Sequence, residues 1–263
     1  LINLYLIKEK VMVEQKKKIP IKSEAAYVMA ILMLSFAVAI LSVADFGLSM
    51  IVSPAYLLSL KTGKLTFGQA EYVLQAALFI VFLIVMRKFK VVYLSSFITC
   101  LIYGFALDMW RKIPCFNPTV INSADIKIWI RALAFIGGVL LTSFSIALFY
   151  KTYFYPQVYD FFVKGVSLKY GIKTTKFKTA FDLTMLIISV AMSLIFFKGF
   201  VGVKWGTLVM AAVNGTLIGW FLKLIDKFFI VEPIFKNFAA KFELDKKPSD
   251  SVSEISCGNE SGC

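Results

Sequence analysis

The chain contains no histidine, which excludes a Ser-His-Asp triad, an imidazole general base and a histidine metal site. Its four cysteines show no Cys-x-x-Cys spacing, so the sequence predicts neither a zinc site nor a disulfide framework. The Gly-x-x-x-x-Gly-Lys-Ser/Thr loop of nucleotide hydrolases is also missing. We therefore expect a protein that is not an enzyme and that uses no metal or cofactor.

Acidic residues are scarce too, with 16 Asp and Glu against 29 Lys and Arg, and the net charge is +13. The chain of 263 residues is 59% hydrophobic, carries 26 phenylalanines and has a mean hydropathy of +0.78. A soluble domain is closer to half apolar. This composition predicts an all-α integral membrane protein. Cytoplasmic loops of such proteins are enriched in Lys and Arg, so the positive charge does not predict nucleic-acid binding.

Six apolar segments approach the length of about 20 residues that a helix needs to cross a bilayer. They are residues 25–43, 70–86, 91–110, 128–150, 180–197 and 206–225. With the N-terminus inside, the inside segments hold 21 Lys and Arg and the outside segments hold 8. This bias predicts six transmembrane helices in the bacterial cytoplasmic membrane, with both termini in the cytoplasm.

The flanks of the membrane domain are polar or amphipathic. The predicted parts are a basic cytoplasmic N-terminus (1–23), a six-helix membrane domain (24–227), an interfacial amphipathic helix (228–244) and a disordered tail (245–263). The interfacial helix is predicted because Phe235, Phe238, Ala239 and Phe242 share one helical face. Met12 begins the basic stretch "MVEQKKKIP", so residues 1–11 are expected to be an over-extended start.

The sequence carries a weak internal repeat at an offset of 111 residues, which lays 65–111 over 176–222. Glu71 then falls on Asp182. A mostly small-residue stripe at every fourth position recurs in both copies, with Ser96, Cys100, Gly104 and Asp108 matching Thr207, Ala211, Gly215 and Gly219. Upstream, each copy has a short segment that begins near a Pro and ends at a Gly (53–63 and 155–171).

The repeat predicts two three-helix units, about 24–111 and 128–225. Because each unit crosses the membrane an odd number of times, the second unit is expected to enter the membrane from the opposite side. Inverted repeats of this kind are common in secondary transporters and also occur in channels. The small-residue stripes predict close helix packing, with the third and sixth spans crossing near the pseudo-twofold axis. Asn214 lies beside this face and predicts either an interhelical hydrogen bond or a ligand contact.

At these residues the chain resembles the YczE/YyaS/YitT family of bacterial membrane proteins, over about residues 25–225. The shared features are Ser53-Pro54 and Thr62-Gly63 before the second span, Lys178 four residues before Asp182, and Gly206-Thr207 followed by Ala211 and Gly215. The first copy has Ser95-Ser96 where the family pattern places Gly-Thr. The resemblance implies a membrane architecture and no particular activity.

The candidate substrate or coupling residues are the polar groups in or near spans. Asp182 lies in an early turn of the fifth span, where Lys178 can pair with it across one helical turn. Glu71 has Gln75 one turn later, and Asp108 lies at the outer end of the third span. Each acid has a structural alternative, because ion pairing, helix termini and interfacial water also accommodate acids.

Other polar and aromatic residues have simpler explanations. Asp45 is interpreted as the exit of the first span. The Pro-headed segments are either half-helices facing a ligand at the midplane or interfacial helices. Several tyrosines are expected either to line a pocket or to form an aromatic belt at the membrane surface, namely Tyr56, Tyr153, Tyr155 and Tyr159.

Three functional hypotheses follow. The first is a small-molecule transporter that works by alternating access, with Glu71 and Asp182 as symmetric gating, coupling or substrate-cation groups. The second is the substrate-binding membrane subunit of an energy-coupling-factor vitamin transporter, suggested by Ala26-x-x-x-Ala30. The third is a membrane scaffold or accessory protein. The expected partners are the lipid bilayer and an unknown small molecule, with a homo-oligomer or a membrane partner complex left open.

Overall fold

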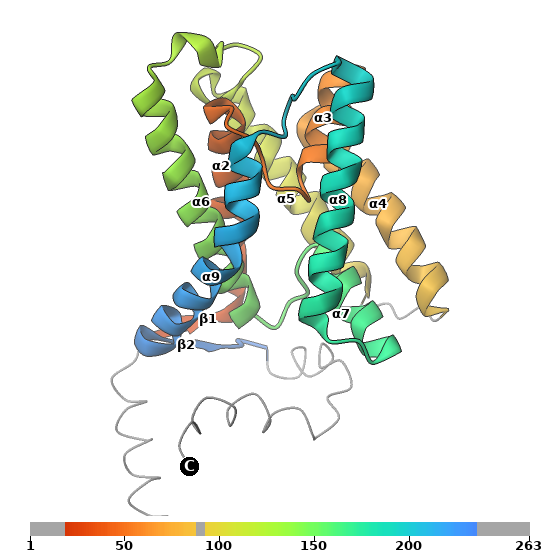
Figure 1. Cartoon of the computed structure of the whole chain (residues 1–263). Helices are drawn as coiled ribbons and strands as arrows, with labels where there is room; N and C mark the ends of the chain where they lie inside the picture. Colours follow the sequence, from red (N-terminus) through yellow and green to blue (C-terminus); the bar gives the residue numbers. More distant parts are fainter. Residues whose placement is uncertain (1–18, 88–92, 236–263) are drawn as a thin grey trace, which may run out of the picture.

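The computed structural model describes residues 19–87 and 93–235, and this part of the chain is almost entirely helical (Figure 1). The long helices are α2 (Ser23–Ala44), α4 (Phe67–Met86), α5 (Leu94–Lys112), α6 (Ile128–Lys151), α8 (Thr174–Phe197) and α9 (Trp205–Phe228). The short elements are β1 (Ile19–Lys22), α3 (Ser53–Thr62), η2 (Pro114–Phe116), η3 (Ser123–Asp125), α7 (Val158–Tyr170) and β2 (Phe229–Glu232). The long helices follow the six predicted apolar segments, which confirms the helical fold class.

Five described helices are long and apolar enough to cross a membrane: α2, α4, α6, α8 from Lys176 onward, and α9. Of the six long helices described, α5 lacks this property, and its 19 residues include Asp108, Arg111 and Lys112. Large apolar side chains cover the outer faces, and Ile84 and Ile195 are 69% and 74% exposed. Helices with apolar outer faces are typical of a multi-pass membrane protein.

The centre of the bundle is the pair α2 and α6, which make the most extensive helix–helix contact of the described chain. Gly138 allows their close approach, because a Cβ there would lie 2.7 Å from the Leu41 side chain. Helix α5 packs against α2, and α9 packs against α6. The prediction that the third and sixth spans cross at the centre is therefore wrong. Small residues on α2, such as the fully buried Ala30 and Ala37, give the first span this central place.

The two short helices confirm the predicted Pro-headed segments that end at Gly. Pro54 lies in the first turn of α3, where its missing N–H costs nothing. Gly63 and Gly171 end α3 and α7 with left-handed φ values of 60° and 65°, a conformation that suits glycine. Both short helices pack against α4 and α8. They lie toward opposite ends of the bundle, α7 at the end near β1 and β2 (Figure 1).

A two-stranded parallel ribbon joins the chain before α2 to the chain after α9. Ile19 pairs with Phe229, and Lys22 pairs with Glu232. The interfacial helix predicted over 228–244 thus differs from the structure at its start, because Phe229–Glu232 is a strand. Its β-branched and aromatic residues favour an extended backbone when a partner strand is adjacent. Residues 236–244, like the predicted tail and residues 1–11, lie outside the described part.

Candidate functional site

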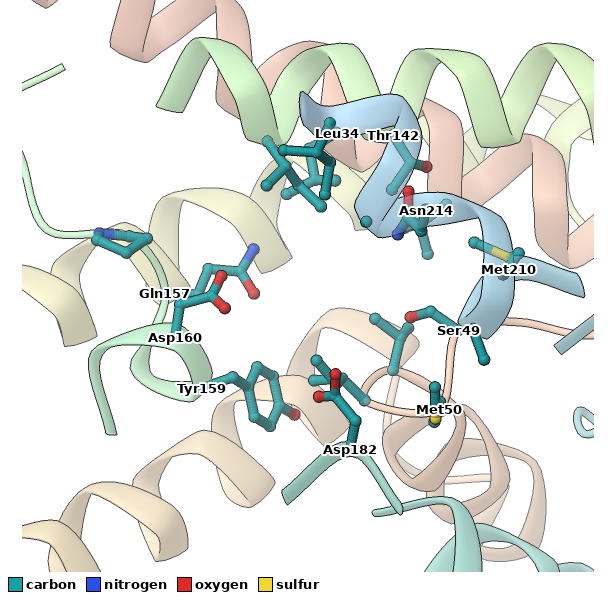
Figure 2. Close-up of a pocket in the computed structure, with 18 of the residues that line it drawn as sticks. Leu34, Ser49, Met50, Thr142, Gln157, Tyr159, Asp160, Asp182, Met210 and Asn214 are labelled. Carbon is teal, nitrogen blue, oxygen red and sulfur yellow. The ribbon is translucent and has the colours of Figure 1, made fainter. Parts of the chain in front are cut away.

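A cavity of about 370 Å³ lies between the α2–α6–α9 side of the bundle and the α3–α7–α8 side. Figure 2 shows Asp182 and Tyr159 facing Thr142 and Asn214 across it. Most of its wall is apolar. The polar and charged groups that line it are Ser49, Tyr103, Thr142, Tyr150, Gln157, Tyr159, Asp160, Lys178, Thr179, Asp182 and Asn214. The cavity therefore combines a mainly apolar surface with a few polar groups, as small-molecule sites do.

Asp182 and Lys178 reach this cavity from the first turns of α8. Their predicted pair is present, with Lys178 Nζ 3.8 Å from Asp182 Oδ1. Lys178 makes its shorter contact with Asp160 Oδ1 of α7, at 2.9 Å. Asp160 was not predicted as a site residue, because a polar residue in a short amphipathic helix gives no sign that it meets a lysine 18 residues later.

Glu71 does not line the cavity but lies behind its wall, fully buried. Its Oε2 accepts hydrogen bonds from Gln75 Nε2 at 3.0 Å and from Tyr159 OH at 3.1 Å. Gln75 also donates to Gln157 Oε1 and accepts from Val158 N, the first backbone N–H of α7, at 3.2 Å each. Glu71 and Gln75 thus fasten α7 to α4.

Tyr159 is the member of this network that separates Glu71 from the cavity. Burial, reinforced by the nearby Glu71 carboxylate, raises the pKa of Tyr159 well above its ordinary value. Its hydroxyl therefore stays protonated and donates to Glu71. Of the four tyrosines considered from the sequence, Tyr159 alone lines this cavity, whereas Tyr103, which also lines it, was missed.

The small-residue stripe of the first repeat packs closely, as predicted. Ser96 and Cys100 are fully buried on α5. A Cβ on Gly68 of α4 would lie 2.1 Å from the backbone oxygen of Gly104, so the two backbones touch. Asp108 reinforces this contact, because its Oδ1 accepts from Gly68 N at 2.9 Å and its Oδ2 accepts from the Thr66 hydroxyl at 2.5 Å. Through these two hydrogen bonds, Asp108 connects α5 to the start of α4.

The stripe of the second repeat packs only at its beginning. Thr207 is fully buried, and a Cβ on Gly47 would lie 2.5 Å from its hydroxyl oxygen. Ala211 and Gly215 instead line the cavity, and a Cβ on Gly215 or Gly219 would meet nothing within 4 Å. The predicted packing role is therefore wrong for Gly215 and Gly219 in this structure, because α8, the neighbour that symmetry would supply, makes at most marginal contact with α9.

Asn214 makes the predicted interhelical hydrogen bond and also lines the cavity. Its Oδ1 accepts from the Ser143 hydroxyl of α6 at 2.5 Å. The bond holds α9 on α6, while the residue's position on the wall leaves the rest of its amide within reach of a ligand. The two interpretations drawn from the sequence are therefore compatible.

Asp45 makes more contacts than expected of a residue that only ends a helix. It adopts a left-handed backbone at φ 55°. Its carboxylate lies 2.7 Å from Lys204 Nζ and 3.5 Å from Arg131 Nη2, and accepts from the Ser123 hydroxyl at 3.2 Å. These contacts join the ends of α2, α6 and α9. The partners lie 78 to 159 residues away along the chain, so no local pattern predicts them.

Next to Asp45, the backbone of the α2–α3 connection is bound to the α8–α9 connection. Leu48 N donates to Gly202 O at 2.9 Å, and Gly206 N donates to Phe46 O at 2.9 Å. Residues 48–52 also form part of the cavity wall. This connection therefore forms the part of the cavity wall that leads into α3.

Metal binding has no support in the described residues, where no group of three or more potential ligands occurs. A family model matches residues 21–223, from β1 into the last turns of α9, and describes a family of unknown function, DUF6198. The chain belongs to this family. No curated protein and no solved structure matches it. The family match includes every cavity residue, and the resemblance to the YczE/YyaS/YitT family stays a prediction.

Proposed function

We propose that the chain crosses the bacterial cytoplasmic membrane six times, as two inverted repeats (α2–α5 and α6–α9), and transports a small molecule by alternating access. Each repeat has the same order of a long helix, a short helix and two long helices. The sixth crossing is α5. This helix starts near the C-terminal end of α4 and finishes at the opposite end of the bundle, where α6 begins (Figure 1). The excess of Lys and Arg in the predicted inside segments supports a cytoplasmic location for both termini.

The observation that carries this proposal is a difference between equivalent interfaces of the two repeats. In the first repeat, Gly68 of α4 touches Gly104 of α5. At the offset of 111 residues their counterparts are Thr179 of α8 and Gly215 of α9, and both line the cavity. The same pair of positions is thus closed in one repeat and open in the other.

Such a difference is what alternating access between inverted repeats requires. If the repeats exchange conformations, α8 closes on α9 while α4 separates from α5, and the cavity becomes accessible from the other side of the membrane. The small residues at Gly215 and Gly219 then have a role, because they permit the close approach of α8 in the second conformation.

The proposal is tested in a variant whose native cysteines are replaced by alanine, because the thiol of Cys115 is exposed. A single cysteine is introduced into the cavity at Ala211, and a membrane-impermeant thiol reagent is added to either side of the membrane. We expect labelling from both sides, and labelling from one side only when Gly215→Leu blocks the closure of α8. Ile187→Cys, whose side chain is 61% exposed on the outer face of α8, is the control and should stay unlabelled in lipid. Identical one-sided labelling with and without Gly215→Leu would argue against alternating access.

The energy-coupling-factor alternative is weakened by the positions of the two alanines that suggested it. Ala26 and Ala30 are both 0% exposed and lie in the core of this chain. They offer no surface to a partner subunit. The scaffold alternative gives no reason for a cavity lined with charged groups.

A further inference from the structure

The charges at the cavity do not balance. Asp160 and Asp182 contribute two carboxylates, and Lys178 contributes one ammonium group. Lys178 hydrogen bonds to Asp160 at 2.9 Å, whereas its 3.8 Å distance to Asp182 Oδ1 is too long for a hydrogen bond. Among the described residues, Asp182 Oδ1 has no hydrogen-bond donor although it is buried. Asp182 therefore lines the cavity with a carboxylate that has no hydrogen-bonded cation among the described residues.

The deeper wall of the cavity adds a second unsatisfied group. Tyr103 is only 1% exposed, and within the described part of the chain its hydroxyl has no hydrogen-bond partner. Behind this wall, Glu71 is held by Gln75 and Tyr159 rather than by a Lys or Arg of the described residues. A buried polar group without a partner is costly. A ligand that donates hydrogen bonds and carries positive charge would satisfy the two groups that line the cavity, Asp182 and Tyr103.

The remaining wall is apolar and aromatic. Leu34, Val38 and Ile146 line it together with Met210 and the ring of Phe149. Such a surface favours an apolar body over a hydrated inorganic ion, which would lose its water shell without gaining enough oxygen ligands. Aromatic rings also attract organic cations through their negative faces.

We propose that the cavity binds a small organic cation, with one ammonium group paired to Asp182 and an apolar or aromatic body against α2, α6 and α9. The assignment rests on the proposed function in taking this cavity as the substrate site. Tyr103 accepts a second hydrogen bond from the ammonium group. Lys178 stays on Asp160 and repels a misplaced cation.

The test is isothermal titration of the full-length protein in lipid nanodiscs with three probes of similar shape: phenethylammonium, phenethyl alcohol and hydrocinnamate. We expect phenethylammonium to bind more tightly than the neutral and anionic probes. Asp182→Asn should weaken phenethylammonium binding by about tenfold or more, because a charge-assisted hydrogen bond is lost. The matched control is Asp226→Asn, which removes a carboxylate paired with Lys151 outside the cavity and should leave binding unchanged.

A second variant separates a binding role from damage to the fold. Lys178→Gln removes the competing ammonium group and should raise the affinity for phenethylammonium, a change that partial unfolding would not produce. Tighter binding of hydrocinnamate, absence of phenethylammonium binding, or full affinity in Asp182→Asn would each overturn the ligand class. These outcomes would leave two-sided labelling of the cavity intact, whereas one-sided labelling with normal cation binding would overturn transport and keep the ligand class.

Discussion

Adding a single methyl group at Gly68 tests whether the backbones of α4 and α5 touch. The new Cβ would lie 2.1 Å from the carbonyl oxygen and 2.7 Å from the carbonyl carbon of Gly104. Backbone atoms cannot rotate away as a side chain can, so the two helices must separate by about 1 Å. Asp108 would lose its hydrogen bonds to Gly68 N and Thr66 as they do so.

The expected cost of Gly68→Ala follows from these contacts. Overpacking costs about 1–3 kcal/mol, and a lost hydrogen bond to a charged group costs about 1.5–3 kcal/mol. The better helix propensity of Ala returns about 1 kcal/mol. With one of the two Asp108 hydrogen bonds lost outright, we therefore expect the free energy of unfolding to fall by roughly 1.5–5 kcal/mol.

Gly215→Ala is the matched control, because Gly215 is the repeat counterpart of Gly104 and a Cβ there meets nothing within 4 Å. We expect its free energy of unfolding to stay the same or to rise by up to about 1 kcal/mol. Both variants are compared with the wild type by denaturant unfolding of the purified protein in detergent micelles, followed by circular dichroism. Equal losses at the two positions, or no loss at Gly68, would refute the described difference between the interfaces.

Three further outcomes are expected. Glu71→Ala should lower the free energy of unfolding by about 2–4 kcal/mol because it leaves the buried Gln75 and Tyr159 donors unpaired. Glu71→Gln should lower it by about 1 kcal/mol or less in the same micelle assay. Equal losses in the two variants would contradict a hydrogen-bonding role. Asp45→Ala should cost about 1–3 kcal/mol because it removes two ion pairs and puts Ala in a left-handed backbone. The Tyr153 phenol, partly buried and hydrogen bonded to Glu24, has its pKa raised to about 12. Its stabilising contribution is therefore present below pH 10 or so and is lost as the pH rises through about 12; an absorbance titration in which Tyr153→Phe removes a transition centred near pH 10 would contradict this.

The helices could be predicted from the sequence because long apolar runs set their limits locally. The six predicted segments and the two short segments ending at Gly63 and Gly171 all coincide with helices. The strand β2 could not be predicted in this way, since four residues become a strand only when Ile19–Lys22 lies alongside. Local patterns thus predict the helices but not the elements that they pack against.

The site was harder to predict because its residues come from distant parts of the chain. Asp182 and Lys178 were found, being one helical turn apart, whereas Asp160 and Tyr103 were not. The small-residue pattern singled out the face of α9 that carries Gly215, and this face borders the cavity. It could not tell whether that face packs against a helix or borders a cavity, because that depends on the position of α8.

The central claim is that α8 closes on α9 while α4 separates from α5. It is tested most directly by disulfide cross-linking of Thr179→Cys with Gly215→Cys in native membranes, after alanine replaces the native cysteines. A disulfide needs Cβ atoms about 4 Å apart, which only the closed arrangement provides. The control is Thr184→Cys with Gly215→Cys, since the repeat counterpart of Thr184 is Val73, which is 50% exposed on α4. We predict rapid cross-linking of the first pair alone. Absence of this cross-link, both with and without phenethylammonium, would contradict the account.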